Sequence, residues 1–158
     1  MMIYEKINTF LMAMLPIGEL RLSIPMAHKL GLDWFDAFIF SVFGNSVITI
    51  ILLFIIHYYQ IKRIKFFISK IPIIGFVFQK WENSSIKKSE KIEKWGYLGL
   101  LLFVGLPLPV TGAWTAVLIA VLLDLKAMKS FFAITCGLII SGSIVSIITV
   151  YLPQILGY

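Results

Sequence analysis

Three long runs without a charged residue constrain this chain more than any other feature of its sequence. They cover residues 37–61, 96–123 and 130–158, and each exceeds the roughly 20 residues that a helix needs to cross the hydrocarbon of a bilayer. The chain is 59% hydrophobic over 158 residues, well above the share usual for a soluble domain. Because backbone polar groups inside a bilayer must be satisfied within the chain, the sequence predicts an all-α integral membrane protein.

Two of the hydrophobic stretches are interrupted at matching places. Residues 15–21 read Leu-Pro-Ile-Gly-Glu-Leu-Arg, and residues 106–112 read Leu-Pro-Leu-Pro-Val-Thr-Gly. A shift of 93 residues places Pro16 on Pro109. The same shift aligns further identical residues: Phe10 with Phe103, Leu32 with Leu125 and Gly44 with Gly137. Paired proline and glycine interruptions in two hydrophobic halves indicate the binding site of a transporter, so we expect an internal repeat with its functional site between the two breaks.

Each half is expected to fold as a re-entrant helical hairpin followed by one transmembrane helix, within a single membrane domain. Residues 7–30 are predicted as the first hairpin and 34–59 as the first spanning helix. Residues 97–123 and 131–152 repeat this order, because closely spaced prolines disfavour one straight helix. A hairpin returns to its own side of the membrane, so each half crosses once and the repeat is inverted. The alternative is four complete spans with both termini in the cytoplasm.

A basic linker separates the two halves. Residues 60–95 hold nine of the fourteen Lys and Arg residues, so the positive-inside rule places this segment in the cytoplasm. Its apolar residues recur at helical spacing on both sides of Pro72, which predicts an interfacial amphipathic helix. With the linker inside and one crossing in each half, both termini lie outside. The expected location is the cell membrane, as a multi-pass protein.

A carboxylate and a guanidinium lie at the first break, where lipid would make both charges costly. Glu19 and Arg21 are two residues apart, so they can meet only at an unwound tip, since such residues do not face each other on a helix. Glu19 could take up and release a proton during transport. Arg21 offers a planar fork for a phosphate or carboxylate. The alternative is a structural pair that locks the hairpins together.

Other candidate site residues are uncharged. The predicted substrate and proton site comprises Glu19, Arg21, Pro16, Gly18, Pro109, Thr111 and Gly112. The free amides of a half-helix that begins near Thr111 and Gly112 could add affinity for an anion. Asn45 could line the cavity, or it could have a structural role by capping or hydrogen-bonding a broken hairpin. Trp114 could either line the cavity or pack in the interior.

Several function classes have no support in the sequence. The single cysteine, Cys136, excludes an internal disulfide and is expected to be a small buried residue. The histidines and acidic residues lack the spacing of a metal site, and no catalytic nucleophile or zinc-protease motif is present, so neither an enzyme nor a cofactor is expected. The net charge of +6 is concentrated in a membrane-tethered linker, which argues against nucleic acid as a partner.

The two breaks also carry a family resemblance. Residues 16–25, the Gly44-Asn45 pair and residues 107–115 (Pro-Leu-Pro-Val-Thr-Gly-Ala-Trp-Thr) resemble the small multidrug export protein family, which is similar to the DedA (VTT-domain, SNARE-associated) group of membrane proteins. The resemblance implies paired re-entrant hairpins, an inverted repeat and transport, and for DedA-type proteins the movement of polyprenyl-phosphate carriers or phospholipids. Typical DedA proteins carry arginines around the second proline. Residues 105–110 have none, so Arg21 would have to supply the charge.

Three functions follow as hypotheses. The first is proton-linked flipping of an amphipathic anion, such as a polyprenyl phosphate or a phospholipid. The second is export of small cationic drugs, with Glu19 as the binding charge, and the third is a membrane scaffold that transports nothing. Arg21 favours the first over the second, because a cation site would not place a guanidinium beside its acid. The expected partners are membrane lipid, protons and a second copy of the chain.

Overall fold

The part of the chain that the structure describes is entirely helical. The computed structural model describes residues 2–16, 19–58, 90–108 and 111–155, which contain helices and no strand. The helices are α1 (Met2–Met14), α2 (Glu19–Lys29), α3 (Trp34–Tyr58), α6 (Glu90–Gly105), α7 (Ala113–Leu122) and α8 (Ala127–Ile155). The prediction of an all-α fold is therefore confirmed over these residues.

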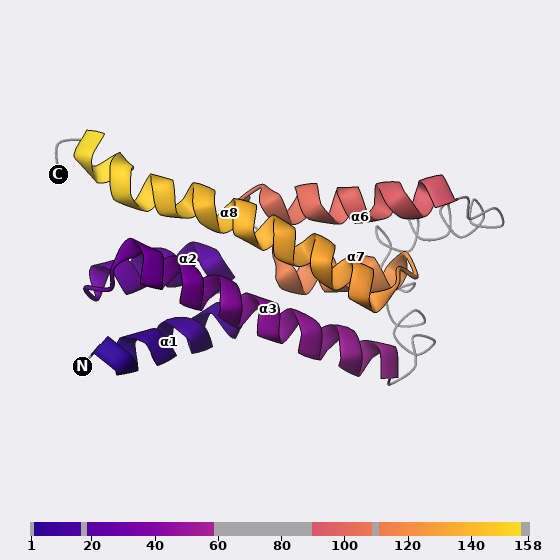
Figure 1. Cartoon of the computed structure of the whole chain (residues 1–158), viewed down its shortest axis with the longest axis horizontal. Coiled ribbons are helices and arrows are strands. Elements are labelled where there is room, and N and C mark those ends of the chain that lie inside the picture. The colour runs from indigo at the N-terminus through magenta and orange to yellow at the C-terminus, as the bar shows by residue number, and fades with distance from the viewer. Residues whose placement is uncertain (1, 17–18, 59–89, 109–110, 156–158) are drawn as a thin grey trace, which may run out of the picture.

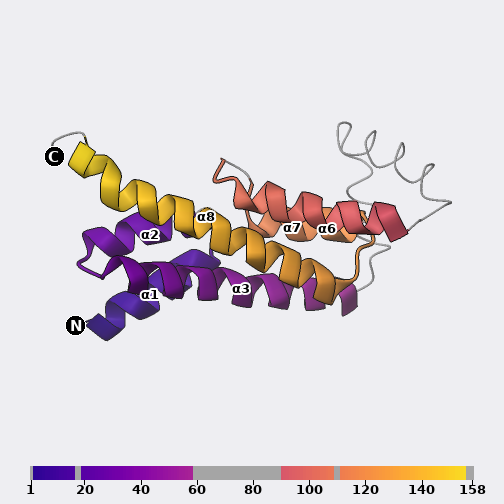
Figure 2. The same ribbon diagram turned by 45° about the horizontal axis from the view of Figure 1, so that its top comes forward.

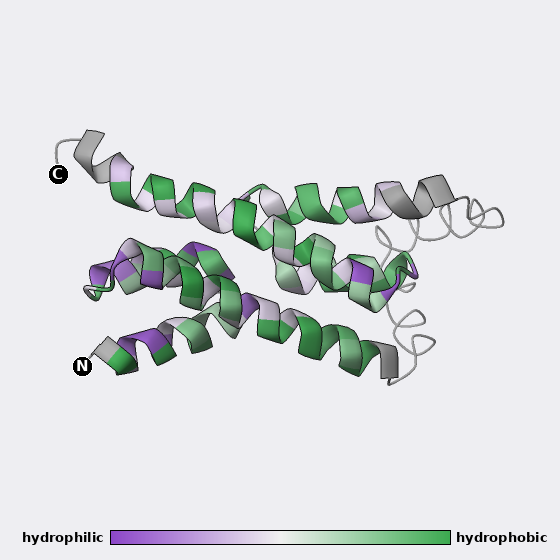
Figure 3. Cartoon of the chain, in the orientation of Figure 1, coloured by the Kyte–Doolittle hydropathy of each residue, from purple (hydrophilic) through white to green (hydrophobic). Residues whose placement is uncertain are grey.

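Two helices are long and apolar enough to cross a membrane. They are Trp34–Ile56 within α3 and Ala127–Tyr151 within α8, and their hydrophobic character runs along most of both ribbons (Figure 3). Within an 18-residue apolar window of each helix, only 28% of the residues of the first and 44% of those of the second are buried within the chain. Large apolar side chains such as Phe43 and Phe132, each 60% exposed, point away from the protein. Such outward apolar surface suits a bilayer and not water.

The other four helices are short and form two antiparallel pairs. They contain 13, 11, 16 and 10 residues, or about 15–24 Å at 1.5 Å per residue, against about 30 Å of hydrocarbon. Helix α1 pairs with α2 at the end of the molecule that holds both termini, and α6 pairs with α7 at the other end (Figures 1 and 2). The turns of the two pairs meet near the middle of the molecule.

Several boundaries differ from the prediction. Helix α1 begins at Met2, α6 begins at Glu90 inside the predicted linker, and α8 runs from Ala127 to Ile155. These extensions take in Glu and Lys residues that favour helix but lie outside the apolar runs. Pro25 does not end α2, although it has no N–H to donate to the carbonyl one turn earlier. Residues 60–89 of the linker lie outside the described part of the chain.

The core joins the short helices of both pairs to the long ones. Its buried residues come from five helices: Leu20, Ile24, Leu53, Leu100, Val104, Ala113, Ala116, Val117, Ala120, Ile134, Leu138 and Val145. Helix α7 contributes three alanines that are at most 1% exposed, and small side chains of this kind allow close helix packing where lipid supplies no hydrophobic driving force. Helix α2 also contacts α8, and α7 contacts α3, so each pair packs against both long helices.

Each half has a glycine at the point where its first helix crosses its long helix. A Cβ atom on Gly44 would collide with the carbonyl oxygen of Phe10, where α1 crosses α3. A Cβ atom on Gly137 would lie 2.7 Å from the carbonyl oxygen of Leu101, where α6 crosses α8. Glycine is thus required by the close approach of the first helix of each half to its long helix. These are two of the residues that the 93-residue shift aligns.

Candidate functional site

The turns of the two short-helix pairs are joined by three polar contacts. We call this region the junction, and it comprises Met14, Glu19, Arg21, Thr111, Gly112, Ala113 and Trp114. Glu19 and Arg21 are both half-buried there. The predicted site residues of the first break are thereby brought against those of the second.

The carboxylate of Glu19 lies at the N-terminus of α7. It accepts hydrogen bonds from the backbone N–H groups of Ala113 and Trp114, the first two residues of that helix. These amides have no partner within the helix and lie at the positive end of its dipole. Gly112 has no space for a side chain, because a Cβ atom built on it would overlap the Glu19 carboxylate. The protein's own carboxylate therefore lies on the amides that were predicted to add affinity for an anion.

Backbone strain accompanies the position of Glu19. Its φ of 41° lies in the left-handed region, which costs a non-glycine residue about 1–2 kcal/mol. Its N–H donates to the carbonyl of Leu15 at 3.2 Å, so the conformation is fixed by the turn that follows α1. Strained residues held in this way are concentrated at functional sites.

Arg21 binds the turn of the second pair. Its Nη2 donates to the carbonyl oxygen of Thr111 and to its Oγ1 at 2.8 Å. The same hydroxyl lies 2.7 Å from the carbonyl oxygen of Leu106 and 2.9 Å from that of Leu108. Having one proton, it can donate to only one of them at a time. Arg21 and Thr111 together hold the end of α6 close to the start of α7.

Trp114 forms the third polar contact of the junction. Its indole Nε1 donates to the carbonyl oxygen of Met14 at 3.2 Å. Met14 is the last residue of α1, so this carbonyl has no partner within the helix. Trp114 therefore links the start of α7 to the end of α1.

Glu19 and Arg21 form their hydrogen bonds with other groups and not with each other. They attract each other electrostatically, but the carboxylate is bound by α7 and the guanidinium by Thr111. Pro16 is exposed in the turn after α1, while Gly18 and Pro109 lie outside the described residues. Sequence reasoning missed Met14 and Ala113, which contribute only backbone atoms and so leave no side-chain signal.

Asn45 donates its hydrogen bond within its own helix, and no hydrogen bond from it to a broken hairpin is seen among the described residues. Asn45 is fully buried, and its Nδ2 donates to the carbonyl of Ser41, 3.3 Å away on its own helix. The link from α2 to α3 is instead made by Ser23, whose Oγ donates to Ser41 Oγ at 2.8 Å. Ser23 could have been found from its spacing, because it lies four residues after Glu19 and so on the same face of α2.

Two further sequence expectations can be compared with the structure. No group of three or more His, Cys, Asp or Glu side chains that could hold a metal occurs among the described residues. Cys136, expected to be buried, is exposed on α8, because an outward apolar face of a membrane helix resembles a core in its composition.

Comparison with known proteins identifies a family but no individual relative. Residues 19–144 match the family described as "Putative small multi-drug export protein", and this range includes all of α3, the first part of α8 and the junction from Glu19 onward. No curated protein and no solved structure matches the chain. The family is a class of export proteins and not of enzymes. Since the match covers well over half of the chain, the protein belongs to the small multi-drug export protein family.

Proposed function

We propose that this protein is a membrane transporter that moves an amphipathic anion, and that the anionic group of the substrate binds at the junction in place of the Glu19 carboxylate. The supporting observation is the position of that carboxylate, on the first amides of α7 and near Arg21. A helix N-terminus and a guanidinium are the two groups that proteins use most readily to bind phosphate and carboxylate. A substrate with either group can take the place of Glu19.

Protonation of Glu19 would empty this site. The neutral acid has no charge to interact with the α7 dipole or with Arg21, so it binds the amides more weakly than the carboxylate does. Uptake of a proton and binding of an anion would then accompany each other, and loss of the proton would return Glu19 to α7 and expel the substrate. This exchange is the proposed basis of proton-linked transport.

The short-helix pairs are proposed to be re-entrant hairpins of an inverted repeat. Each short helix is below the length of a full span, and the two pairs extend from opposite ends of the molecule to the junction (Figure 1). With hairpins entering from opposite faces, the junction lies near the middle of the bilayer, the depth at which transporters of this architecture bind substrate. The linker would be cytoplasmic and both termini outside, in the cell membrane.

The proposed substrate class is a lipid phosphate, either a polyprenyl phosphate or a phospholipid. The resemblance to DedA-type proteins and the exposed apolar surface of α3 and α8 both favour a substrate with a long apolar tail. Export of small cationic drugs is the second candidate, and the family description favours it. A cation would have to displace two backbone amides from Glu19 while remaining near Arg21, which is electrostatically unfavourable.

Glu19→Gln is expected to lower translocation of a fluorescent polyprenyl phosphate in proteoliposomes about tenfold or more. Glutamine resembles the neutral acid, so it leaves the site open but cannot return as a carboxylate to expel the substrate, and the hydrogen bonds of that charged group contribute about 1.5–3 kcal/mol each. It should also remove the dependence of the rate on a pH gradient, because glutamine cannot exchange a proton. Glu5→Gln is the matched control, since Glu5 lies in the first turn of α1, away from the junction. Unchanged transport by Glu19→Gln would contradict the proposal. Movement of cationic dyes without lipid phosphate would favour drug export.

The topology can be tested with two single cysteines. Lys29 precedes α3 and Lys126 precedes α8, and both are exposed. In a Cys136→Ser background, a membrane-impermeant maleimide should label Lys29→Cys from outside intact cells and Lys126→Cys only after permeabilisation. Four complete spans would instead place both positions on the outer side. Labelling of both in intact cells would therefore exclude the hairpins.

A further inference from the structure

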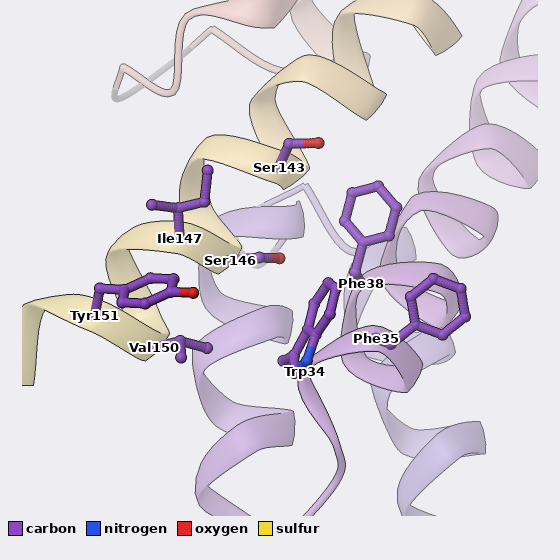
Figure 4. A pocket seen from close by; sticks show the side chains of 8 residues that line it. All are labelled: Trp34, Phe35, Phe38, Ser143, Ser146, Ile147, Val150 and Tyr151. Carbon is purple, nitrogen blue, oxygen red and sulfur yellow. The ribbon is translucent and has the colours of Figure 1, made fainter.

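A cavity separate from the junction lies between the two long helices. It has a volume of about 380 Å³ and is formed by the first turns of α3 and the second half of α8 (Figure 4). The lining residues are Trp34, Phe35, Phe38, Ser143, Ser146, Ile147, Val150 and Tyr151. The cavity is at the end of the molecule that holds both termini, away from the turn of the second short-helix pair.

Most of the lining is apolar and none of it is charged. Aromatic rings from α3 form one wall, and Ile147 and Val150 of α8 form part of the other. The nearest acidic groups have partners already, since Asp36 pairs with Lys6 at 2.8 Å and Asp33 accepts the N–H of Phe35 at 3.2 Å. An uncharged, apolar body fits this lining better than an ion does.

One polar group in the wall lacks a partner. Ser146 is 5% exposed, and its Oγ has no hydrogen-bond partner among the described residues. In Figure 4 this oxygen points from α8 towards the aromatic wall. Ser143 differs, because its hydroxyl donates to the carbonyl of Ile139 at 2.8 Å on its own helix. The wall of the cavity thus contains one unused hydroxyl donor, buried beneath the surface. A rotation of the Ser146 side chain would bring it into the cavity, where a donor in apolar surroundings calls for an acceptor.

We propose that this cavity binds the acyl chain of a membrane lipid, with the ester carbonyl of the chain accepting a hydrogen bond from Ser146. The chain would lie against Trp34 and Phe38, and the headgroup would remain in the interfacial region, where Trp and Tyr residues such as Trp34 and Tyr151 are typically found. The proposal requires a bilayer around α3 and α8. It does not require that the protein transports anything, and it uses no residue of the junction.

The test is photo-crosslinking in vesicles of phosphatidylcholine that contain a phosphatidylcholine with a diazirine on its acyl chain. Peptide mapping should find more label on residues 34–38 and 143–151 than on Phe132 and Ile139, exposed residues of α8 outside the cavity. Ser146→Ala should lower the label in the cavity about fivefold relative to Phe132, which corresponds to one hydrogen bond of about 1 kcal/mol.

Two further variants complete the experiment. Ser143→Ala is the matched control and should keep the label, because its hydroxyl is already used within α8. Ile147→Trp, which fills the cavity, should lower the label even if Ser146→Ala perturbs the fold. Label in the cavity no higher than at Phe132, or equal in wild type and Ser146→Ala, would overturn the proposal.

Discussion

Gly112→Ala is expected to abolish transport while the protein stays folded. The added methyl group would occupy the space of the Glu19 carboxylate, so this carboxylate would leave the amides of Ala113 and Trp114. The end of a glutamate side chain moves easily, and we therefore expect the free energy of unfolding to fall only by about 1.5–3 kcal/mol, the range for a hydrogen bond to a charged group. Chemical unfolding in detergent and transport in proteoliposomes measure the two effects.

The expected loss of transport in Gly112→Ala has a steric cause and not a conformational one. Gly112 has φ −135° and ψ −174°, an extended conformation that alanine also adopts. Gly99→Ala is the matched control, because a Cβ atom on Gly99 has no atom within 4 Å among its described surroundings. The control should leave transport unchanged and raise stability by about 0.5–1 kcal/mol. Wild-type transport by Gly112→Ala would mean that the contact between Glu19 and α7 is not needed.

A double variant separates the contact from other effects of the methyl group. In a Glu19→Gln background the charge at the start of α7 is already lost, so Gly112→Ala should destabilise the protein less than it does in the wild type. Residues in direct contact typically show such non-additive energies of 0.5–3 kcal/mol. Fully additive losses would indicate that the methyl group acts on α7 itself.

The sequence located the junction but could not identify its contacts. The helix breaks follow from Pro16 and Pro109, and Glu19 and Arg21 stand out as charges in apolar surroundings. Their partners are the N–H of Ala113 and the carbonyl and hydroxyl oxygens of Thr111. Backbone groups exist at every residue, so the choice among them depends on how the two short-helix pairs pack, which composition and periodicity do not specify.

Predictions of burial and of hydrogen bonds across helices were less successful, for two physical reasons. Cys136 lies in an apolar run and is exposed, because lipid-facing and core-facing residues are equally hydrophobic in a bilayer. Asn45 was expected to reach a neighbouring helix, but short polar side chains readily bond to the carbonyl one turn earlier, as Asn45 does to Ser41. The all-α fold was easier to predict, since long uncharged runs allow few alternatives.

Arg21→Ala is expected to have the other large effect. It removes the hydrogen bonds to both oxygens of Thr111 and the positive charge that attracts Glu19. We expect the free energy of unfolding to fall by about 1.5–3 kcal/mol and transport to be lost, since the proposed site would keep the α7 amides but no cation. Lys6→Ala is the control, because its partner Asp36 is also partly exposed and such pairs contribute about 0–1 kcal/mol.

The Arg21→Lys variant separates the effect of the positive charge of Arg21 from the effect of its planar geometry. Lysine keeps the positive charge but lacks the planar fork that can bind two acceptors at fixed positions. If Arg21 only balances the charge of Glu19, Arg21→Lys should restore both stability and transport. If its role is to hold Thr111 and to bind the substrate anion, as proposed, Arg21→Lys should recover part of the stability and little of the transport. Because the two roles predict different pairs of measurements on the same variant, unfolding and transport assays on Arg21→Lys can decide between a charge-balancing arginine and a substrate-binding one.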